Sequence, residues 1–386
     1  MTTALIIGFF MSFFLIVLIV GKKSKVHSDI YLICMLAVYG ITIGGAYIEI
    51  FNLNNNYPFP HLMNNAWLFL LLYGPFIWLY IKSLTTKGFK FKYIYLIHFS
   101  PFVIYLALHY FNFFRLSAEE KIFLTQTESF TTTLFFKIRG LSIAFSTIGY
   151  NIWALILLHK HKQNIVSQFS NIENIDLKWL RTFVIASLFI FSLNVFLFNL
   201  NNYIHFTGFY SLSEIAYSFS TIYVLYIGYY GLRQGSVFVD SPAFENQQNN
   251  PSMIKKQVPD TLKTKGFNEI IDKLSKLMEE KQPYLDPDIS LAKLNNLVQT
   301  KPEILSEVLN SVLNQSFFDY INKQRIEEFK IQCLNKNKKH LSIMGIAYEC
   351  GFNSKAAFYR AFNKFEGSSP TAYISKVSYK CETLLH

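Results

Sequence analysis

Residues 347–374 read AYECGFNSKAAFYRAFNKFEGSSPTAYI, which predicts a helix, a tight turn and a second helix. Gly351 permits the turn because glycine adopts left-handed backbone conformations without a steric cost. Asn353 or Ser354 caps the second helix. Its three phenylalanines recur at i, i+4 and i+7 and are expected to face a core: Phe358, Phe362 and Phe365. The outer face is then basic and aromatic, and consists of Lys355, Ala356, Tyr359, Arg360 and Asn363.

The residues before this stretch repeat the arrangement. In SLAKLNNLVQTKPEILSEVLNSVL, residues 290–313, Ser290 caps a first helix and Pro302 occupies the first position of a second. Apolar residues at helical spacing are expected to face inward: Leu291, Leu294, Leu297, Leu305, Val308, Leu309 and Val312. A longer helix, FFDYINKQRIEEFKIQCL at 317–334, connects this unit to the next. The C-terminal part therefore predicts two helix-turn-helix units.

Upstream of these units the composition changes. The chain of 386 residues is 51% hydrophobic and 16% charged, whereas soluble domains contain about 25% charged residues. Residues 1–240 hold 16 Lys and Arg and 9 Asp and Glu, which leaves 20 and 16 for residues 241–386. The sequence therefore predicts an all-α protein in which a membrane domain, residues 1–234, precedes a soluble all-α domain.

Seven apolar runs approach the ~20 residues that a membrane-spanning helix needs. They lie near 4–20, 29–50, 66–82, 93–111, 138–158, 178–199 and 213–231. The first run lacks a preceding basic region and a small-residue cleavage site, so it is interpreted as a span and not as a signal peptide. A seven-helix bundle in the lipid bilayer is expected.

The loops between the runs predict the orientation. Those after the first, third and fifth runs are cationic: GKKSKVH, KSLTTKGFKFK and HKHKQ. FNLNNNYPFPHLMNN and LNNYIHFTGFYSL contain neither Lys nor Arg. Because Lys and Arg mark cytoplasmic loops, the N-terminus is expected outside the cell (inner) membrane. Seven spans then leave everything after Arg233 in the cytoplasm.

Residues 235–258 predict a linker, because helical periodicity disappears and Pro242 and Pro251 interrupt a polar sequence. Residues 259–283 predict a connecting helix with an apolar stripe formed by Ile270, Ile271, Leu274, Leu277 and Met278. The stripe either docks on residues 284–386 or pairs with a second copy of the chain in a homodimer.

Ionisable side chains inside spans are candidates for a ligand site. His98 and His109 are eleven residues apart, which is about three helical turns, so they are expected to share a helix face. They either line a small-molecule pocket or supply hydrogen bonds between packed helices. No HExxH, DxxD or serine motif accompanies them, and no metal-ligand spacing joins Cys34, Cys333, Cys350 and Cys381. The sequence thus predicts no enzyme, no metal and no cofactor.

The segment from about Tyr284 to Ser375 resembles the AraC/XylS family of bacterial transcription regulators. The second unit matches the family's motif at Ile343, Ile346, Ala347, Gly351, Phe352, Ser354, Phe358, Arg360, Phe362, Gly367, Pro370 and Tyr373. The first helix-turn-helix and the helix at 317–334 match at Leu305, Ser306, Ile321, Asn322, Arg325 and Ile326. The front half is similar to multi-span, membrane-bound members through GPFIWLYIKSL at 74–84.

This resemblance implies that two recognition helices enter successive major grooves of double-stranded DNA. Base-edge contacts are then expected from Lys355, Ala356, Tyr359 and Arg360, and in the first unit from Glu303, Ile304, Ser306 and Glu307. Phosphate contacts are expected from Ser354, Lys339 and Lys364. Residues 284–332 hold five Lys and Arg against seven Asp and Glu, whereas 333–386 hold eight against three. The second helix-turn-helix is therefore expected to dominate DNA binding.

Together these patterns predict a membrane-embedded transcription regulator whose front half senses a ligand. One alternative is a transporter or membrane enzyme with a helical, protein-binding tail. It requires charged pairs or a reactive motif within the spans. Another is a scaffold with a degenerate DNA-binding domain, which the acidic first unit favours.

Overall fold

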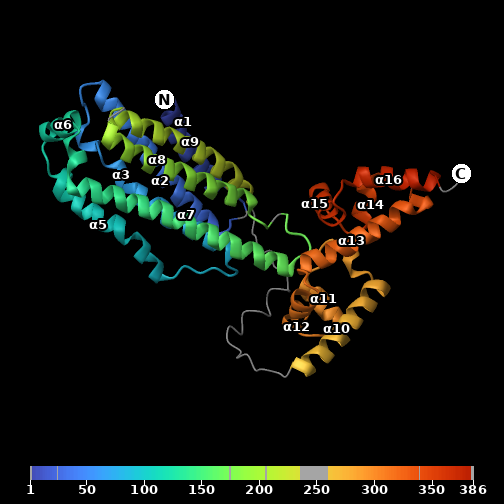
Figure 1. Ribbon diagram of the computed structural model, residues 1–386. Coiled ribbons are helices and arrows are strands. Elements are labelled where there is room, and N and C mark those ends of the chain that lie inside the picture. Colours follow the sequence, from blue (N-terminus) through green and yellow to red (C-terminus); the bar gives the residue numbers. More distant parts are fainter. Residues whose placement is uncertain are drawn as a thin grey trace. The chain divides into compact units, whose positions relative to one another are not determined.

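The computed structural model describes residues 2–23, 25–173, 175–204, 207–234, 260–338 and 340–383. Every regular element in these ranges is a helix, which confirms the all-α prediction (Figure 1). The chain divides into two compact units. The first comprises Met1–Lys160 and Leu177–Val237, and the second comprises His161–Asp176 and Phe238–His386. The predicted linker, 235–258, lies outside the described residues.

Helices form at each of the seven apolar runs of the first unit. The third run is divided between two helices, and α6 lies outside the runs. The helices up to Arg233 are α1 Thr2–Val20, α2 His27–Asn54, α3 Ala66–Phe69, α4 Tyr73–Thr85, α5 Ser100–His109, α6 Ala118–Thr127, α7 Leu134–Gln168, α8 Lys178–Ile204 and α9 Phe209–Arg233. Short 3₁₀ turns lie at η1 Pro60–Leu62, η2 Leu70–Leu72, η3 Tyr93–Phe99 and η5 Ser129–Thr132, and a π-helical turn at η4 Tyr110–Phe114. Helices α1, α2 and α9 pack against one another, α4 packs on α2, and α8 packs on α9.

Six stretches of the described chain are long and apolar enough to cross a membrane. They are Thr2–Val20, His27–Asn54, Pro60–Thr85, Tyr93–Phe114, Leu134–Gln168 and Lys178–Asn201. The seventh predicted run, 213–231, forms α9 but is not among them. Six of the seven predicted runs thus have the length and composition of a membrane span, and the crossing of a membrane stays a prediction.

The helix at the third apolar run is interrupted next to its Gly74-Pro75 pair. The turn η2 separates α3 from α4, and Pro75 lies near the start of α4, where its missing N–H leaves no hydrogen bond unmade. A Cβ atom at Gly74 would lie 2.4 Å from Cδ2 of Tyr150. The glycine thus permits the close approach of the Tyr150 ring, so this break in the helix accommodates a neighbouring side chain.

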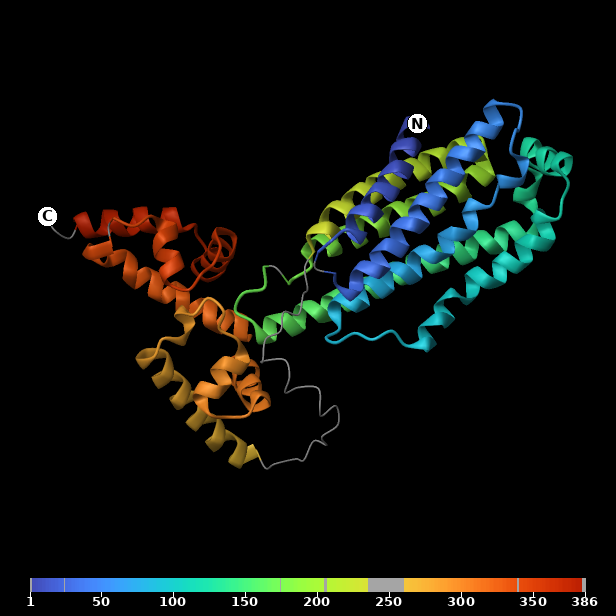
Figure 2. The same cartoon turned by 180° about the vertical axis from the view of Figure 1, so that it is seen from behind.

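The second unit is built on one long helix. Its elements are α10 Asp260–Glu280, η7 Pro283–Leu285, α11 Leu291–Val298, α12 Pro302–Glu307, the π-helical turn η8 Val308–Val312, α13 Phe317–Leu334, η9 Lys336–Lys338, α14 Ile343–Glu349, α15 Lys355–Glu366 and α16 Pro370–Thr383. Figure 2 shows α13 running between one group formed by α10, α11 and α12 and another formed by α14, α15 and α16.

Each group encloses its own core. In the first core, α10 buries its apolar stripe against α11, α12 and α13 through Leu274, Leu277, Met278, Leu294, Leu305 and Ile321. The structure thus selects docking of the stripe within the chain over the alternative of pairing with a second copy. The second core joins α13 to α14 and α15 through Phe329, Ile346, Ala347, Cys350, Phe358 and Phe362.

Two expected core residues lie at the surface. Leu297 is 44% exposed and Val312 is 42% exposed. In α11 the inward position after Leu294 is Val298, four residues on, so Leu297 lies beside the buried face. The π-helical turn η8 widens the end of α12, which breaks the 3.6-residue period that placed Val312 inward.

Candidate nucleic-acid interface

Helix α15 is fixed at both ends and along its inner face. The Ser354 side chain accepts a hydrogen bond from the Ala357 backbone N–H at 3.1 Å, as the predicted cap requires. Gly367 ends the helix with a φ of 64°. Phe358 and Phe362 are fully buried, and their ring centroids lie 4.6 and 5.7 Å from that of Phe329 on α13. The backbone and inner face of α15 are therefore held in one position.

The outer face of α15 is the one the sequence predicted. Lys355, Ala356, Arg360 and Asn363 are exposed, whereas Tyr359 is half-buried. The Lys355 ammonium lies 5.5 Å from the centroid of the Tyr359 ring, a cation–π distance. Four of the predicted base-contacting residues thus lie together on one rigid surface.

The turn before α15 couples the two groups of helices. Gly351 has a φ of +89°, and a Cβ there would lie 2.5 Å from the Tyr284 carbonyl oxygen. Arg325 Nε donates to that same oxygen at 2.7 Å, and its NH2 donates to the Asp286 carbonyl at 2.8 Å. Burial lowers the pKa of Arg325 to about 10, so it stays protonated at pH 7. A sequence match marks Arg325, but only the fold shows that it links η7 to α13.

The first recognition helix, α12, presents no cation among its predicted contacts. Glu303 and Glu307 are exposed, whereas Ile304 and Ser306 are half-buried. The Ser306 hydroxyl accepts from Asn310 Nδ2 at 3.2 Å. Asn314, which follows this helix, has a φ of 49°, a left-handed conformation that asparagine tolerates. The geometry of the unit is intact, but its outer surface is acidic.

Two of the residues predicted to contact phosphates, Ser354 and Lys364, already have partners within the protein. Lys364 Nζ lies 2.6 Å from Asp319 Oδ1, and this ion pair joins α15 to α13. The Ser354 hydroxyl is already used in capping. Lys339 lies outside the described residues. Lys364 therefore has to exchange one carboxylate for a phosphate to serve as predicted.

A segment between α7 and α8 belongs to the second unit and contacts its helices, which the sequence did not indicate. Phe169 and Ser290 form an antiparallel backbone bridge. Ser170 Oγ donates to the Ile289 carbonyl at 2.9 Å and accepts from Arg325 NH2 at 3.2 Å. Glu173 Oε1 lies 4.0 Å from Arg360 NH2. Residues 169–173 are hereafter the α7–α8 strap. Its polar, aperiodic sequence carries no pairing signal.

The predicted ligand residues of the first unit do not share contacts. His98 Nδ1 lies 2.7 Å from the Tyr150 hydroxyl, and the His98 ring lies 4.4 Å from that of Trp78. His109 Nε2 instead lies 2.9 Å from Asn65 Oδ1. The break between η3 and α5 separates the two histidines. Their described neighbours support two separate polar contacts.

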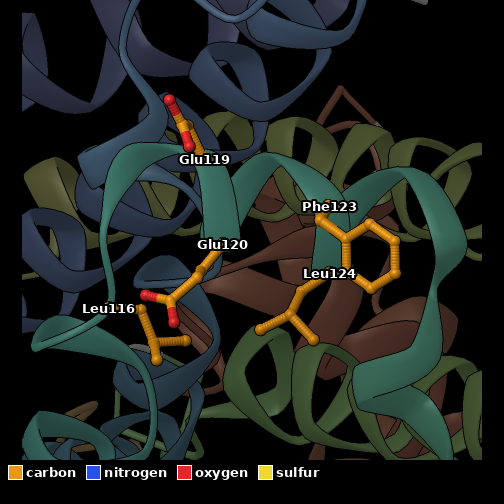
Figure 3. Close-up of a pocket in the computed structure, with 5 residues that line it drawn as sticks. All are labelled: Leu116, Glu119, Glu120, Phe123 and Leu124. Atoms are coloured by element: carbon orange, nitrogen blue, oxygen red, sulfur yellow. The ribbon is translucent and has the colours of Figure 1, made fainter.

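One surface pocket of about 400 Å³ lies over α6 (Figure 3). Its lining comes from a single stretch of chain: Leu116, Glu119, Glu120, Phe123 and Leu124. One Glu120 carboxylate oxygen already accepts from the Ser117 backbone N–H at 2.8 Å, in the cap of α6. The pocket has no cationic side chain among its lining residues, and none of the predicted ligand residues lies in it.

Comparison with known proteins agrees with the geometry of the second unit. A family profile described as a helix-turn-helix domain matches residues 296–376. Uncharacterized HTH-type transcriptional regulators of Staphylococcus aureus strains COL, MSSA476 and N315 are each 28% identical over 102 residues. Each match covers 26% of this chain and 13% of the relative. No solved structure matches. The chain thus contains a C-terminal helix-turn-helix domain similar to those of transcription regulators.

Proposed function

We propose that this protein is a membrane-embedded, sequence-specific transcription regulator of the AraC type. The observation that carries the proposal is the exposed face of α15, where Lys355, Tyr359 and Arg360 stand on a helix held by buried phenylalanine rings. An α-helix fits the major groove, and an arginine fork bonds guanine O6 and N7 there. The matched helix-turn-helix profile supports the same role.

In this proposal α15 reads bases and α12 adds little attraction. Arg360 and Lys355 supply positive charge to the groove, whereas Glu303 and Glu307 are repelled by phosphates. Glutamate accepts from cytosine N4, so α12 either reads cytosine or stays at a distance. The two recognition helices would lie in successive major grooves, about 34 Å apart along the duplex.

The first unit is proposed to span the cell (inner) membrane with its N-terminus outside. The six apolar stretches support this placement, and so do their exposed aromatic side chains, for example Phe13 at 65% and Phe145 at 78%. Exposed apolar area of this extent is stable in lipid and not in water. With α9 as a seventh span, the helix-turn-helix domain would lie in the cytoplasm with the DNA. The distribution of Lys and Arg among the loops supports that orientation.

The membrane half is proposed to sense a small-molecule ligand and to hold two copies together. A ligand shifts DNA binding only through different affinities for two states of the chain. Two copies held side by side raise each other's effective concentration to about the mM range. Because α10 buries its stripe within the chain, pairing is expected through the membrane helices.

Genome-wide DNA crosslinking to the intact chain tests the proposed function. Discrete sites sharing a sequence motif are expected, and they should disappear in Lys355→Ala/Arg360→Ala. A matched control is Lys276→Ala, since Lys276 is exposed on α10, away from the recognition helices. Crosslinking without enriched sites, or sites unaffected by the double substitution, would exclude α15 as the DNA-reading helix.

A further inference from the structure

The first unit encloses two buried charged side chains, of which Glu49 accepts a hydrogen bond and Arg139 makes none with the described residues. Arg139 of α7 is 4% exposed and Glu49 of α2 is 1% exposed. Arg139 forms no hydrogen bond or ion pair with any residue that the structure describes, although its guanidinium stacks 4.8 Å from the Phe136 ring centroid. A buried cation without an anionic partner is strongly disfavoured. An anionic group bound beside Arg139 would remove this cost.

Further polar atoms of the same region also have no hydrogen-bond partner. These are Asn64 Oδ1, His109 Nδ1, Tyr217 OH and Trp67 Nε1, the last of which lies near the Glu49 carboxylate. Tyr217 interacts electrostatically with both Glu49 and Arg139, and His109 interacts with Arg139. Asn64 donates its backbone N–H to Glu49 Oε1 at 3.0 Å. Side chains from α2, α3, α5, α7 and α9 thus converge on one unsatisfied polar site.

The charges of the site select the class of ligand. Glu49 and Arg139 interact electrostatically, yet no nitrogen–oxygen pair between them lies within the 4.0 Å of an ion pair. A lone anion would satisfy Arg139 but would be repelled by Glu49. A lone cation would satisfy Glu49 but would be repelled by Arg139. A zwitterion places its carboxylate at Arg139 and its ammonium at Glu49, and leaves no buried charge unpaired.

We propose that Arg139, Glu49 and Tyr217 bind a small zwitterion of the amino-acid type. Arg139 binds the carboxylate of the ligand and Glu49 binds its ammonium group. The Tyr217 hydroxyl forms a hydrogen bond with one of these two groups of the ligand. The proposal deepens the proposed sensing function by naming the ligand class. It does not depend on DNA binding.

Thermal unfolding of the full chain in lipid nanodiscs tests this site. The probes are the standard free L-amino acids, each added separately, with acetate and ethylammonium as half-ligands. At least one amino acid should raise the Tm by about 5 °C at about a hundredfold its Kd. Neither half-ligand should do so.

Variants separate binding from structure. Arg139→Met should keep or raise the Tm without ligand, because it removes an unpaired buried charge, and should abolish the ligand shift. Tyr217→Phe should reduce the shift, whereas Tyr110→Phe, at an exposed tyrosine, should not. No shift with any amino acid, or an equal shift in Arg139→Met, overturns the proposal and leaves water as the occupant.

A second inference rests on the α7–α8 strap. Ser170 is only 2% exposed, and three hydrogen bonds join it to Ile289, Asn322 and Arg325. Asn322 Nδ2 donates to the Ser170 carbonyl at 3.1 Å. Within the second unit, the strap is therefore fixed to the helix-turn-helix domain by specific, buried contacts.

The charge of the strap matches the surface it approaches. The strap, residues 169–173, contains one acidic residue, Glu173, and neither Lys nor Arg. Residues 333–386 hold eight Lys and Arg against three Asp and Glu. Glu173 faces Arg360, a predicted base-reading residue, at 4.0 Å. A DNA phosphate near Arg360 would repel the Glu173 carboxylate, so the two anions compete.

We infer that the strap is an intramolecular inhibitor that DNA must displace from the helix-turn-helix domain. This inference rests on the proposed DNA binding. It gives the membrane half a route to the domain that does not pass through the linker, because the strap continues directly from α7 and leads into α8.

Ser170→Leu in the full chain tests the strap. Leucine offers no acceptor to Arg325, and Arg325 keeps its bonds to the Tyr284 and Asp286 carbonyls. Affinity for the strongest crosslinked DNA fragment should rise about fivefold to fiftyfold, the worth of the two net hydrogen bonds that the Ser170 hydroxyl makes. Ser167→Leu is the matched control, because the Ser167 hydroxyl bonds only to Asn164 of its own helix.

Hydrogen exchange supplies a second measurement. Amides of residues 169–173 should exchange faster when wild-type protein is saturated with DNA. Unchanged or weaker binding of Ser170→Leu, or continued protection of 169–173 on DNA, overturns the inference. If neither wild type nor Ser170→Leu binds DNA, the proposed function itself fails.

Discussion

Arg360→Ala is the substitution that most directly tests how this protein reads DNA. The Arg360 side chain is 57% exposed, and its one ion contact, to Glu173, lies at the 4.0 Å limit. Its removal should therefore change the free energy of unfolding by less than about 0.5 kcal/mol. One bidentate base contact contributes about 1–3 kcal/mol to specific binding, so the operator Kd should rise about fivefold to 150-fold.

The assay is fluorescence anisotropy of the full chain in nanodiscs, with a labelled fragment recovered by crosslinking. Arg360→Lys keeps the charge but loses the fork, so it should lose most of the specific affinity and keep the salt dependence. Asn363→Ala, one turn along the same exposed face, is the matched control. The series is repeated with Glu173→Gln, because loss of the Glu173 contact would partly mask the loss of a base contact. A folded Arg360→Ala protein with unchanged operator affinity would refute the reasoning.

Three further outcomes are expected. Glu307→Arg should raise general DNA affinity and steepen the salt slope by about one unit, measured by anisotropy across a salt series; an unchanged slope would mean that α12 does not reach the duplex. Gly351→Ala should destabilise the second unit by roughly 2–4 kcal/mol, because a Cβ would meet the Tyr284 and Leu285 carbonyl oxygens. Faster hydrogen exchange in 343–366 should report this loss, and wild-type exchange rates there would contradict it. Cys350 is fully buried and burial raises the pKa of its thiol to about 12, so iodoacetamide at neutral pH should label it only after unfolding in urea.

The interior of each helical group was largely predictable from the sequence. Phe358 and Phe362 recur at helical spacing and are buried, as that period requires. The period failed at Leu297 and Val312, where a short helix and a π-helical turn alter which residue faces inward. The base-reading roles of Lys355, Tyr359 and Arg360 remain predictions, since their exposure is necessary for DNA contact but does not demonstrate it.

The sequence by itself determined the features that depend on neighbouring residues. Ser290, Ser342 and Ser354 accept hydrogen bonds from backbone N–H groups three residues later, and Gly351 and Gly367 adopt positive φ. Each choice is made by local geometry, so a short stretch encodes it.

Only the tertiary structure decided which distant surfaces meet. Ser170 pairs with Arg325, 155 residues away, and α10 docks its stripe on α11, α12 and α13. Arg139 and Glu49 approach each other only because five helices converge around them. Such contacts depend on the complementary shape and charge of surfaces that form after the helices do, and no local pattern in the chain specifies them.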